Sequence, residues 1–471
     1  MKHFTILARV LCLHLIGCLP FIPSGARSAV MVRTLFTFPV PTNGYRPDSG
    51  LVLGTDGAFY GTAQKGGAYA HGTLYRITPQ GSFSVVHHFV GTNDGADAFS
   101  RLVAGPNGVF YGTAWHGGKS NSGTVFEFDP IGTFGPAVTV LHSFSGLGFG
   151  TTSGLTMGTN GLLYGSTSGN GFGSLFTVST AGTYKDFYLF SGTNDGYSPN
   201  QPLLQASDGK FYGTAQFGGT FGISNYSMGL GTVFRCDADG SNFASAAFTS
   251  PLTGANPFGG LAEGADGNLY GITAKGGTNG LGTIFRVTRN LQITTLYSFV
   301  DSGQGEYPNV ELLAAKDGFL YGLVPGDSTN NTGTIFRIST NGQYTVLFQM
   351  QQTNGEYAVH SDALTQGTDG LIYGVTAYGG DQSSDGTFFC MDTSGTNSVP
   401  PSIVSQSYSN GTFILTYNTT PGQTYQILYA STLQGKWTDL GAPRLATTNS
   451  ATASFPITNF STGFYKFIAQ P

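Results

Sequence analysis

The sequence predicts an all-β protein, a seven-bladed β-propeller closed by an N-terminal strand and followed by a small β-sandwich domain. A turn motif of the form [DN]-G-x-x-Y-G occurs seven times, at spacings of 48 to 58 residues. Regular periods of this length are typical of repeat folds. The composition agrees, because 72 glycines and 37 phenylalanines among 471 residues fit short strands joined by tight turns.

Residues 1–26 have the features of a signal peptide. Basic residues precede the apolar stretch VLCLHLIG, and Ser24 and Ala26 fit a small-x-small cleavage site. The stretch LIGC resembles a lipoprotein signal, but apolar residues continue beyond Cys18, which favours ordinary cleavage after Ala26. The apolar stretch is too short for a membrane span. We therefore expect a secreted or cell-surface protein without a membrane span.

Residues 33–397 contain seven repeats of about 52 residues, and each repeat divides into four short strands. In the first complete copy, GLVLGT leads into the Asp56-Gly57 turn and AFYGTA leads out of it, followed by GTLYRIT and FSVVHHF. Asx-Gly pairs suit two-residue hairpins, which need positive φ. Such a sheet cannot bury both faces alone, so consecutive repeats are predicted to stack radially. The repeated tyrosines are Tyr60, Tyr111, Tyr164, Tyr212, Tyr270, Tyr321 and Tyr373.

The two ends of the array predict how the ring closes. The seventh repeat ends after GTFFCMDTSG without a fourth strand, whereas residues 33–38, RTLFTF, match the fourth-strand pattern of TVLHSF and TTLYSF. An open solenoid would not need a missing strand at one end that matches an extra strand at the other. The N-terminal strand is therefore predicted to complete the last blade.

The C-terminal part follows a different pattern. Residues 398–402 lie in a Pro- and Ser-rich linker, and residues 403–471 contain at least five short alternating stretches. This number of strands predicts a sandwich of fibronectin type III or immunoglobulin type. Trp437 is interpreted as a buried core residue of that sandwich.

The repeat motif also resembles a known family. The pattern L-x-x-x-x-[DN]-G-x-x-Y-G, followed by G-G and G-T-[VIL]-F, resembles the GloVer tandem repeat of secreted bacterial choice-of-anchor proteins. The resemblance covers about residues 33–397, and residues 403–471 resemble fibronectin type III-like modules of such proteins. It implies an exported repeat protein and no catalytic residue.

Several kinds of site are not expected. The net charge is −5 and no basic stripe is present, so nucleic acid is not an expected partner. The histidines show no metal-binding spacing, and neither a cofactor nor a metal is expected. Cys236 and Cys390 fall in third strands of non-adjacent repeats and are predicted to be unpaired. The Asx-Gly carboxylates are interpreted as turn residues, and the protein is expected to be a monomer.

Loop length predicts where a ligand would bind. In a four-stranded meander, the first and third connections lie on one face, here named the short-turn face. The second connections and the links between blades lie on the other, the long-loop face, where the sequence varies most. Aromatic and hydrogen-bonding residues of these loops form the candidate ligand site: Lys65, Trp115, His116, Tyr197, Phe217, Lys275, Tyr307, Tyr357 and Tyr378.

Two function classes remain open. The first is a non-catalytic binding or scaffold protein that holds an extracellular glycan or protein on the long-loop face. The second is an extracellular polysaccharide-active enzyme, a lyase or glycoside hydrolase, with its site at the propeller centre. That enzyme would need two suitably separated carboxylates or a metal cluster. The available loop residues are Asp97, Asp195, Glu306, Glu356, His360 and Asp362. No arrangement of these residues in the sequence indicates a catalytic site, which favours the binding protein. The aromatic residues could instead wedge neighbouring blades together.

Overall fold

The computed structural model describes most of the repeat region and parts of the C-terminal region. The described residues are 30–38, 43–98, 100–130, 137–145, 153–168, 171–219, 228–300, 308, 310–324, 333–350, 364–379, 386–393, 403–409, 412–418, 424–430, 438–439, 444–445, 450–456 and 464–470. Strands dominate, and the helices in these ranges are two short 3₁₀ turns, η1 (Pro106–Gly108) and η2 (Pro251–Thr253). No helix among them is long and apolar enough to cross a membrane.

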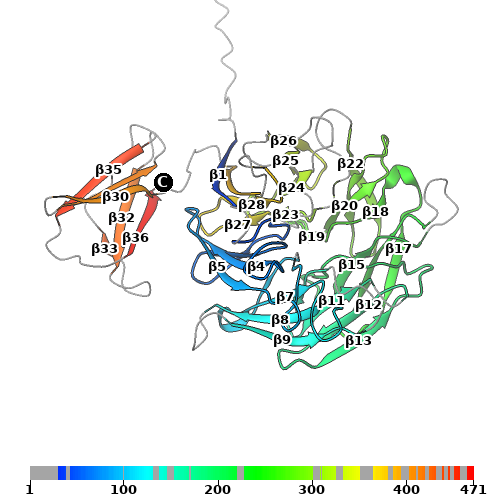
Figure 1. Cartoon of the computed structure of the whole chain (residues 1–471). Helices are drawn as coiled ribbons and strands as arrows, with labels where there is room; N and C mark the ends of the chain where they lie inside the picture. The colour runs from blue at the N-terminus through cyan, green and yellow to red at the C-terminus, as the bar shows by residue number, and fades with distance from the viewer. Residues whose placement is uncertain are drawn as a thin grey trace, which may run out of the picture.

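Seven antiparallel sheets form a propeller (Figure 1), which confirms the predicted all-β class and blade number. Blade 1 contains β2 (Val52–Leu53), β3 (Phe59–Ala63), β4 (Thr73–Ile77) and β5 (Phe83–His88). Blade 2 contains β6 (Val103–Ala104), β7 (Phe110–Ala114), β8 (Thr124–Asp129) and β9 (Ala137–Ser143). Blade 3 contains β10 (Thr156–Met157), β11 (Leu163–Thr167), β12 (Ser174–Val178) and β13 (Tyr184–Leu189). Blade 4 contains β14 (Leu204–Gln205), β15 (Phe211–Ala215), β16 (Thr232–Cys236) and β17 (Ala244–Ala247).

The remaining blades follow the same plan. Blade 5 contains β18 (Ala255–Pro257), β19 (Ala262–Glu263), β20 (Leu269–Lys275), β21 (Thr283–Val287) and β22 (Ile293–Ser298). Blade 6 contains β23 (Leu313–Ala314), β24 (Leu320–Val324), β25 (Thr334–Ile338) and β26 (Tyr344–Gln349). Blade 7 contains β27 (Thr365–Gln366), β28 (Ile372–Thr376) and β29 (Thr387–Asp392). β1 (Met31–Thr37) pairs antiparallel with β29, in the outer place that a fourth strand occupies elsewhere.

The first strand of each blade lies toward the middle of the ring. Figure 1 shows β19, β23 and β27 around the centre and β9, β13 and β22 at the rim. In agreement, first strands of neighbouring blades contact each other, as β2 does with β6 and β19 with β23. Residues just before these strands therefore lie closest to the axis.

Packing and turn geometry explain the repeated motif. In blade 5, the Tyr270 hydroxyl donates to Oδ2 of Asp266 at 2.7 Å, and Oδ1 of Asp266 accepts the Asn268 N–H at 3.2 Å. The glycine after the tyrosine leaves room for the third-strand aromatic ring, because a Cβ at Gly271 would lie 2.6 Å from Cζ of Phe285. The same pair recurs in other blades, such as Gly213 with Phe234 and Gly374 with Phe389. The motif thus encodes a turn and a core contact.

The two cysteines of the propeller are free, as predicted, and both are buried. Cys236 lies in β16 of blade 4 and Cys390 in β29 of blade 7. Burial raises the pKa of both thiols to about 12. Neither thiol is therefore poised for nucleophilic chemistry.

The C-terminal region contains two separate sheets. One has the strand order β30-β31-β35, and in the other β32 pairs with β33, β34 and β36. These strands are β30 (Ile403–Ser409), β31 (Thr412–Asn418), β32 (Thr424–Ala430), β33 (Thr438–Asp439), β34 (Arg444–Leu445), β35 (Ser450–Pro456) and β36 (Phe464–Gln470). Trp437 and residues 398–402, named in the sequence predictions, lie outside the described residues.

Candidate functional site

The links that enter the blades place the candidate residues on the inner edge of the long-loop face. In blades 1, 2, 4 and 5, the link pairs briefly with the residue five positions after the repeated tyrosine. Tyr197 forms an antiparallel bridge with Phe217, and in blade 5 Ala255 pairs with Lys275. Blades 1 and 2 have the equivalent bridges Tyr45–Lys65 and Ala96–His116. Because the link continues the line of the innermost strand, these residues lie near the mouth of the ring.

The next link residue in each of these blades has a left-handed backbone. The residues are Arg46 (φ 57), Asp97 (φ 54), Ser198 (φ 60) and Asn256 (φ 53). This conformation is uncommon for residues other than glycine. At Asp97 it joins two blades, because its N–H donates to the His71 carbonyl of blade 1 at 3.1 Å. Its carbonyl accepts the Trp115 N–H of blade 2 at 3.5 Å. The backbone thereby fixes where these side chains begin.

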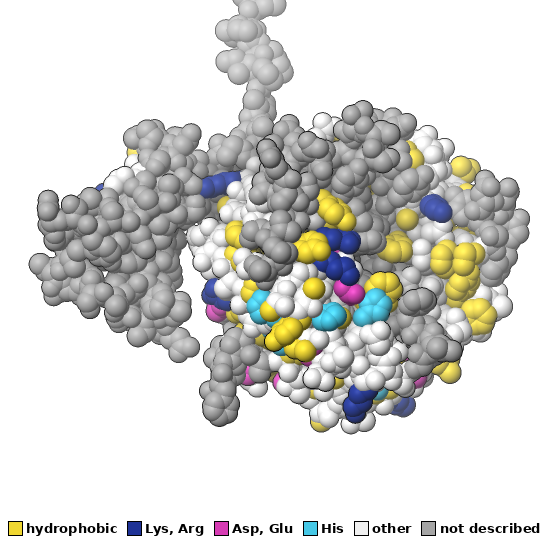
Figure 2. All heavy atoms as spheres, viewed as in Figure 1, with side chains coloured by type: hydrophobic (Ala, Val, Ile, Leu, Met, Phe, Trp, Pro, Cys, Tyr) yellow, Lys and Arg dark blue, Asp and Glu magenta, His cyan; other side chains and the backbone are white. Residues whose placement is uncertain are grey.

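Five residues from blades 1 and 2 and their links form what we name the charged cluster: Arg46, Asp48, Lys65, Asp97 and His116. Nζ of Lys65 donates to Oδ1 of Asp97 at 2.5 Å. Nδ1 of His116 lies 2.9 Å from Oδ2 of the same carboxylate. Asp97 thus holds a cationic side chain on one side and an imidazole on the other. Figure 2 shows basic, acidic and histidine side chains gathered near the middle of one face.

The second carboxylate of the charged cluster is buried. Oδ2 of Asp48 lies 3.1 Å from Nη2 of Arg46, and the Asp48 side chain is only 2% exposed. Burial raises the pKa of Asp48 to about 7, although the charges of Arg46 and Lys65 oppose this shift. The Arg46 guanidinium also lies 5.4 Å from the ring centroid of Tyr378 in blade 7. The cluster consequently connects three neighbouring blades.

A second group, which we name the aromatic cluster, lies between blades 3 and 4. It consists of Phe172, Tyr197 and Phe217. Their ring centroids are 5.8 Å apart for Phe172 and Tyr197 and 5.2 Å apart for Tyr197 and Phe217. The Phe172 residue is 47% exposed, an unusual state for a large apolar side chain. This cluster offers adjoining ring surfaces to solvent.

The remaining candidates are divided among other environments. Trp115 is half-buried, with its ring 4.6 Å from that of His116, and Lys275 is exposed in blade 5. Asp195 is buried, and its carboxylate accepts hydrogen bonds from Ser191 and from the Tyr188 hydroxyl, so it serves its own link. The predicted residues outside the described part of the chain are Tyr307, Tyr357, Glu306, Glu356, His360 and Asp362.

Sequence reasoning missed three residues of the two clusters. Arg46 and Asp48 stand in the first link, whose residues carry no repeated signature. Phe172 precedes the Gly-Ser that opens β12, the place that His71 occupies before Gly-Thr in blade 1. An alignment of the repeats on these glycines gives Phe172 the position of His71, but its contact with Tyr197 appears only when neighbouring blades are placed side by side. No such alignment places Asp48 beside Arg46, because the contact depends on side-chain direction.

The axis itself contains an ion pair. Arg101 and Glu311 each lie two residues before a first strand, in blades 2 and 6. Nη1 of Arg101 lies 3.9 Å from Oε2 of Glu311. Burial raises the pKa of the Glu311 carboxyl, and the Arg101 charge opposes this shift. Glycines occupy the equivalent place in blades 1, 3 and 5, which are Gly50, Gly154 and Gly260.

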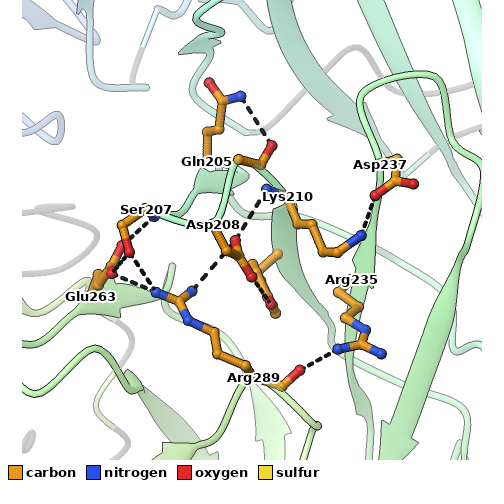
Figure 3. Close-up of polar contacts among 10 residues, drawn as sticks. Gln205, Ser207, Asp208, Lys210, Arg235, Asp237, Glu263 and Arg289 are labelled. Carbon is orange, nitrogen blue, oxygen red and sulfur yellow. Dashed lines mark hydrogen bonds and ion pairs between the residues drawn. The ribbon is translucent and has the colours of Figure 1, made fainter.

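Polar groups of the short-turn face join neighbouring blades. Figure 3 shows Arg289 of blade 5 reaching Glu263 and Ser207, with Nη2 of Arg289 2.5 Å from Oε1 of Glu263. Glu263 also accepts the Ser207 N–H of blade 4 at 2.8 Å. Gln205 accepts the Thr159 N–H of blade 3 at 2.8 Å in the same way. These groups make contacts between blades, although Nη1 of Arg289 has no hydrogen-bond partner among the described residues.

No three His, Cys, Asp or Glu side chains within the described ranges are placed to hold a metal ion. Among the described carboxylates on the inner side of this face, Asp48 pairs with Arg46, Asp97 with Lys65 and His116, and Glu311 with Arg101. The arrangement can therefore present N–H donors and aromatic planes to a ligand.

The fold and the repeated motif define a β-propeller built from tandem repeats. The chain belongs to the Gloeobacter/Verrucomicrobia repeat family, whose model matches residues 25–171 and 223–442, more than half of the chain. This confirms the repeat family that the motif resembles. Among proteins with curated descriptions, no match to the chain is found.

Solved structures give more distant likenesses. Puromycin hydrolase is 12% identical, with 82% of this chain and 62% of that chain covered and a TM-score of 0.48. Dipeptidyl peptidase 4 of Porphyromonas gingivalis is 10% identical, with coverages of 81% and 59% and a TM-score of 0.39. A protein from Lactobacillus plantarum is 15% identical, with coverages of 66% and 86% and a TM-score of 0.43. The chain spans less than two thirds of the first two proteins. None of these values supports an inference about what this chain binds or catalyses.

Proposed function

We propose that the protein is an exported, non-catalytic binding protein whose long-loop face holds an extracellular carbohydrate. The observation that carries this proposal is the aromatic cluster, in which Phe172, Tyr197 and Phe217 adjoin on the face where the loops vary. Sugar rings have apolar C–H faces that stack on such planes, while nearby polar groups bond their hydroxyls. The alternative ligand is a protein, whose surface would contact the same side chains.

The enzyme alternative has less support. A glycoside hydrolase needs two carboxyl groups that both face the scissile bond. Among the described residues of the charged cluster, Asp48 is buried and both oxygens of Asp97 are bonded. These contacts favour binding over acid–base chemistry at this place.

Export and architecture belong to the same proposal. The basic and apolar N-terminal stretch and the small-x-small site at Ala26 support signal cleavage and a secreted or cell-surface location. The pairing of β1 with β29 supports closure of the ring by the N-terminal strand. The two sheets of residues 403–470 support a small C-terminal sandwich of fibronectin type III kind. We also propose that the protein acts as a monomer.

A polysaccharide panel tests the proposed function. The purified mature protein is assayed for retention of each polysaccharide and for release of soluble products. Retention without product release is expected, and release would favour the enzyme alternative. Phe172→Ala should lower retention with little change in melting temperature. Leu189→Ala, which removes an apolar side chain that is 71% exposed on the outer strand β13, serves as the control. Retention of no polysaccharide would contradict the proposal.

A further inference from the structure

We infer that the charged cluster binds the anionic groups of an acidic carbohydrate, so that the ligand is a polysaccharide bearing carboxylates or sulfate esters. The inference rests on the proposed function and narrows its ligand class. It is carried by the way in which Arg46, Lys65 and His116 are exposed while the carboxylates between them are covered.

Exposure separates donors from acceptors in this cluster. The side chains of Lys65 and His116 are 35% and 39% exposed, whereas that of Asp97 is 17% exposed. Arg46 is likewise more exposed than Asp48, which lies beneath it. The ligand therefore meets mainly cationic groups and N–H donors. Carboxylates and sulfates are pure acceptors and match such a surface, whereas a neutral sugar also needs acceptors for its hydroxyl protons.

Asp97 acts as a positioning residue. Its two oxygens are used by Nζ of Lys65 and Nδ1 of His116. Lys65 has three ammonium donors, so two remain after this contact. His116 bonds Asp97 through Nδ1, which directs Nε2 on the opposite side of the ring away from the carboxylate. The carboxylate thus positions the Lys65 ammonium and the His116 ring and limits their rotamers before the ligand arrives, which reduces the entropy lost on binding. Nε2 of His116 donates to an anion only when the imidazole carries both protons.

The hydrogen-bonding capacity of the cluster is not exhausted. Nε of Arg46 and Oδ1 of Asp48 are buried side-chain atoms without a hydrogen-bond partner among the described residues. Buried polar atoms without partners are uncommon, and each needs an explanation such as a bound water or ligand. The buried Nε and Oδ1 are out of reach of a polymer. The terminal nitrogens of Arg46 can offer donors to an anion, because the contact with Asp48 is made by Nη2. A guanidinium suits carboxylate and sulfate oxygens because its donors are arranged as a planar fork.

The aromatic cluster complements this site. An acidic polysaccharide has sugar rings as well as charges, and blades 3 and 4 offer rings at Phe172, Tyr197 and Phe217 on the same face. The protein has a net charge of −5, so attraction of an anion depends on the local cations. Added salt screens such contacts between partly exposed charges.

Affinity measurements on the full mature chain test the inference with pairs of polymers that differ only in charge. The first pair is polygalacturonate and its fully methyl-esterified form, and the second is a sulfated galactan and its desulfated form. We expect an acidic polymer to bind at least about tenfold more tightly than its neutral partner. This preference should decrease as sodium chloride rises from about 50 to 500 mM. The first pair reports on carboxylates and the second on sulfates.

Two lysine variants localise the effect. Lys65→Met should reduce affinity for the acidic polymer by about tenfold, because it removes a charged donor. Lys185→Met is the control, since Lys185 is exposed on the outer strand β13 and lies outside both clusters and the candidate ligand site. The control should bind like the wild type, and both variants should keep the wild-type melting temperature within a few degrees. Asp97→Asn should weaken binding of both acidic polymers while leaving the small affinity for neutral forms unchanged.

The outcomes separate this inference from the proposed function. Equal binding of charged and neutral polymers, or equal losses for Lys65→Met and Lys185→Met, would overturn the acidic ligand while leaving a carbohydrate-binding protein. Binding of neutral polymers alone would do the same. Absence of binding to every polymer would overturn both. Should Lys65→Met unfold, Lys65→Gln replaces it in the comparison.

Discussion

Arg101 and Glu311 occupy the same position in two blades that are not neighbours, and their charged groups lie 3.9 Å apart at the axis of the ring. Blades 2 and 6 are separated by at least three steps around the ring, so this pair connects parts of the propeller that share no sheet contact. Both side chains are partly exposed. The pair therefore fixes the centre of the fold, where glycines at the equivalent positions leave space.

Removal of one partner should be more harmful than removal of both. Glu311→Leu leaves the Arg101 guanidinium without its carboxylate, and we expect the free energy of unfolding to fall by about 1 to 3 kcal/mol. The double variant Arg101→Met with Glu311→Leu should lie within about 1 kcal/mol of the wild type. Urea denaturation of the four members of this cycle measures the coupling. Additive effects of the two single changes would show that the pair does not interact.

The repeated Tyr-Gly step is expected to be intolerant of any side chain at the glycine. A Cβ at Gly271 would lie 2.6 Å from the buried ring of Phe285, so Gly271→Ala should cost about 2 to 3 kcal/mol through overpacking. Gly267→Ala is the control, because a Cβ there has no neighbour within 4 Å and only its φ of +76° is unfavourable. Thermal denaturation gives both costs. Phe285→Leu should rescue part of the loss at Gly271 and none at Gly267.

The sequence predicts the propeller well because each repeat contains the residues that form its own turn and core contact. Asp266, Tyr270 and Gly271 form a turn and a core contact within one blade, and both are visible as a short motif. The third-strand aromatic completes that contact only about fourteen residues later. Seven copies of a local rule therefore predict seven sheets.

The site is less predictable because it depends on contacts between repeats. Lys65 and His116 could be proposed from their position after Tyr-Gly, but their common partner Asp97 lies in the link between them and has no motif. The burial of Asp48 beneath Arg46 follows from side-chain packing that composition does not encode. Phe172 joins Tyr197 only when two blades are placed side by side.

Both propeller thiols should be unreactive toward thiol reagents in the native protein. Cys236 and Cys390 are buried and their pKa values are raised to about 12, so little thiolate forms near pH 8. The mature chain should react with a thiol reagent only after unfolding in denaturant. It should then give two thiols without prior reduction. Reaction of either thiol at the rate of a free peptide in the native state would contradict its buried placement.

Stability should fall with rising pH because of Asp48. Burial raises its pKa from 3.8 to about 7, so the folded state binds the proton more tightly than the unfolded state does. Between pH 4 and 7, unfolding therefore releases this proton. The resulting stability is fully present below about pH 4 and is lost as the pH rises through 7. The loss is at most about 4 kcal/mol, at 1.36 kcal/mol for each pKa unit.

Asp48→Asn cannot ionise, so its stability should fall less than that of the wild type across this window. Urea denaturation at pH 4, 5.5 and 8 measures the difference, with Asp239→Asn, an exposed residue of the same type, as the control. Parallel pH profiles for the wild type and Asp48→Asn would show that Asp48 titrates normally and remains charged in the fold.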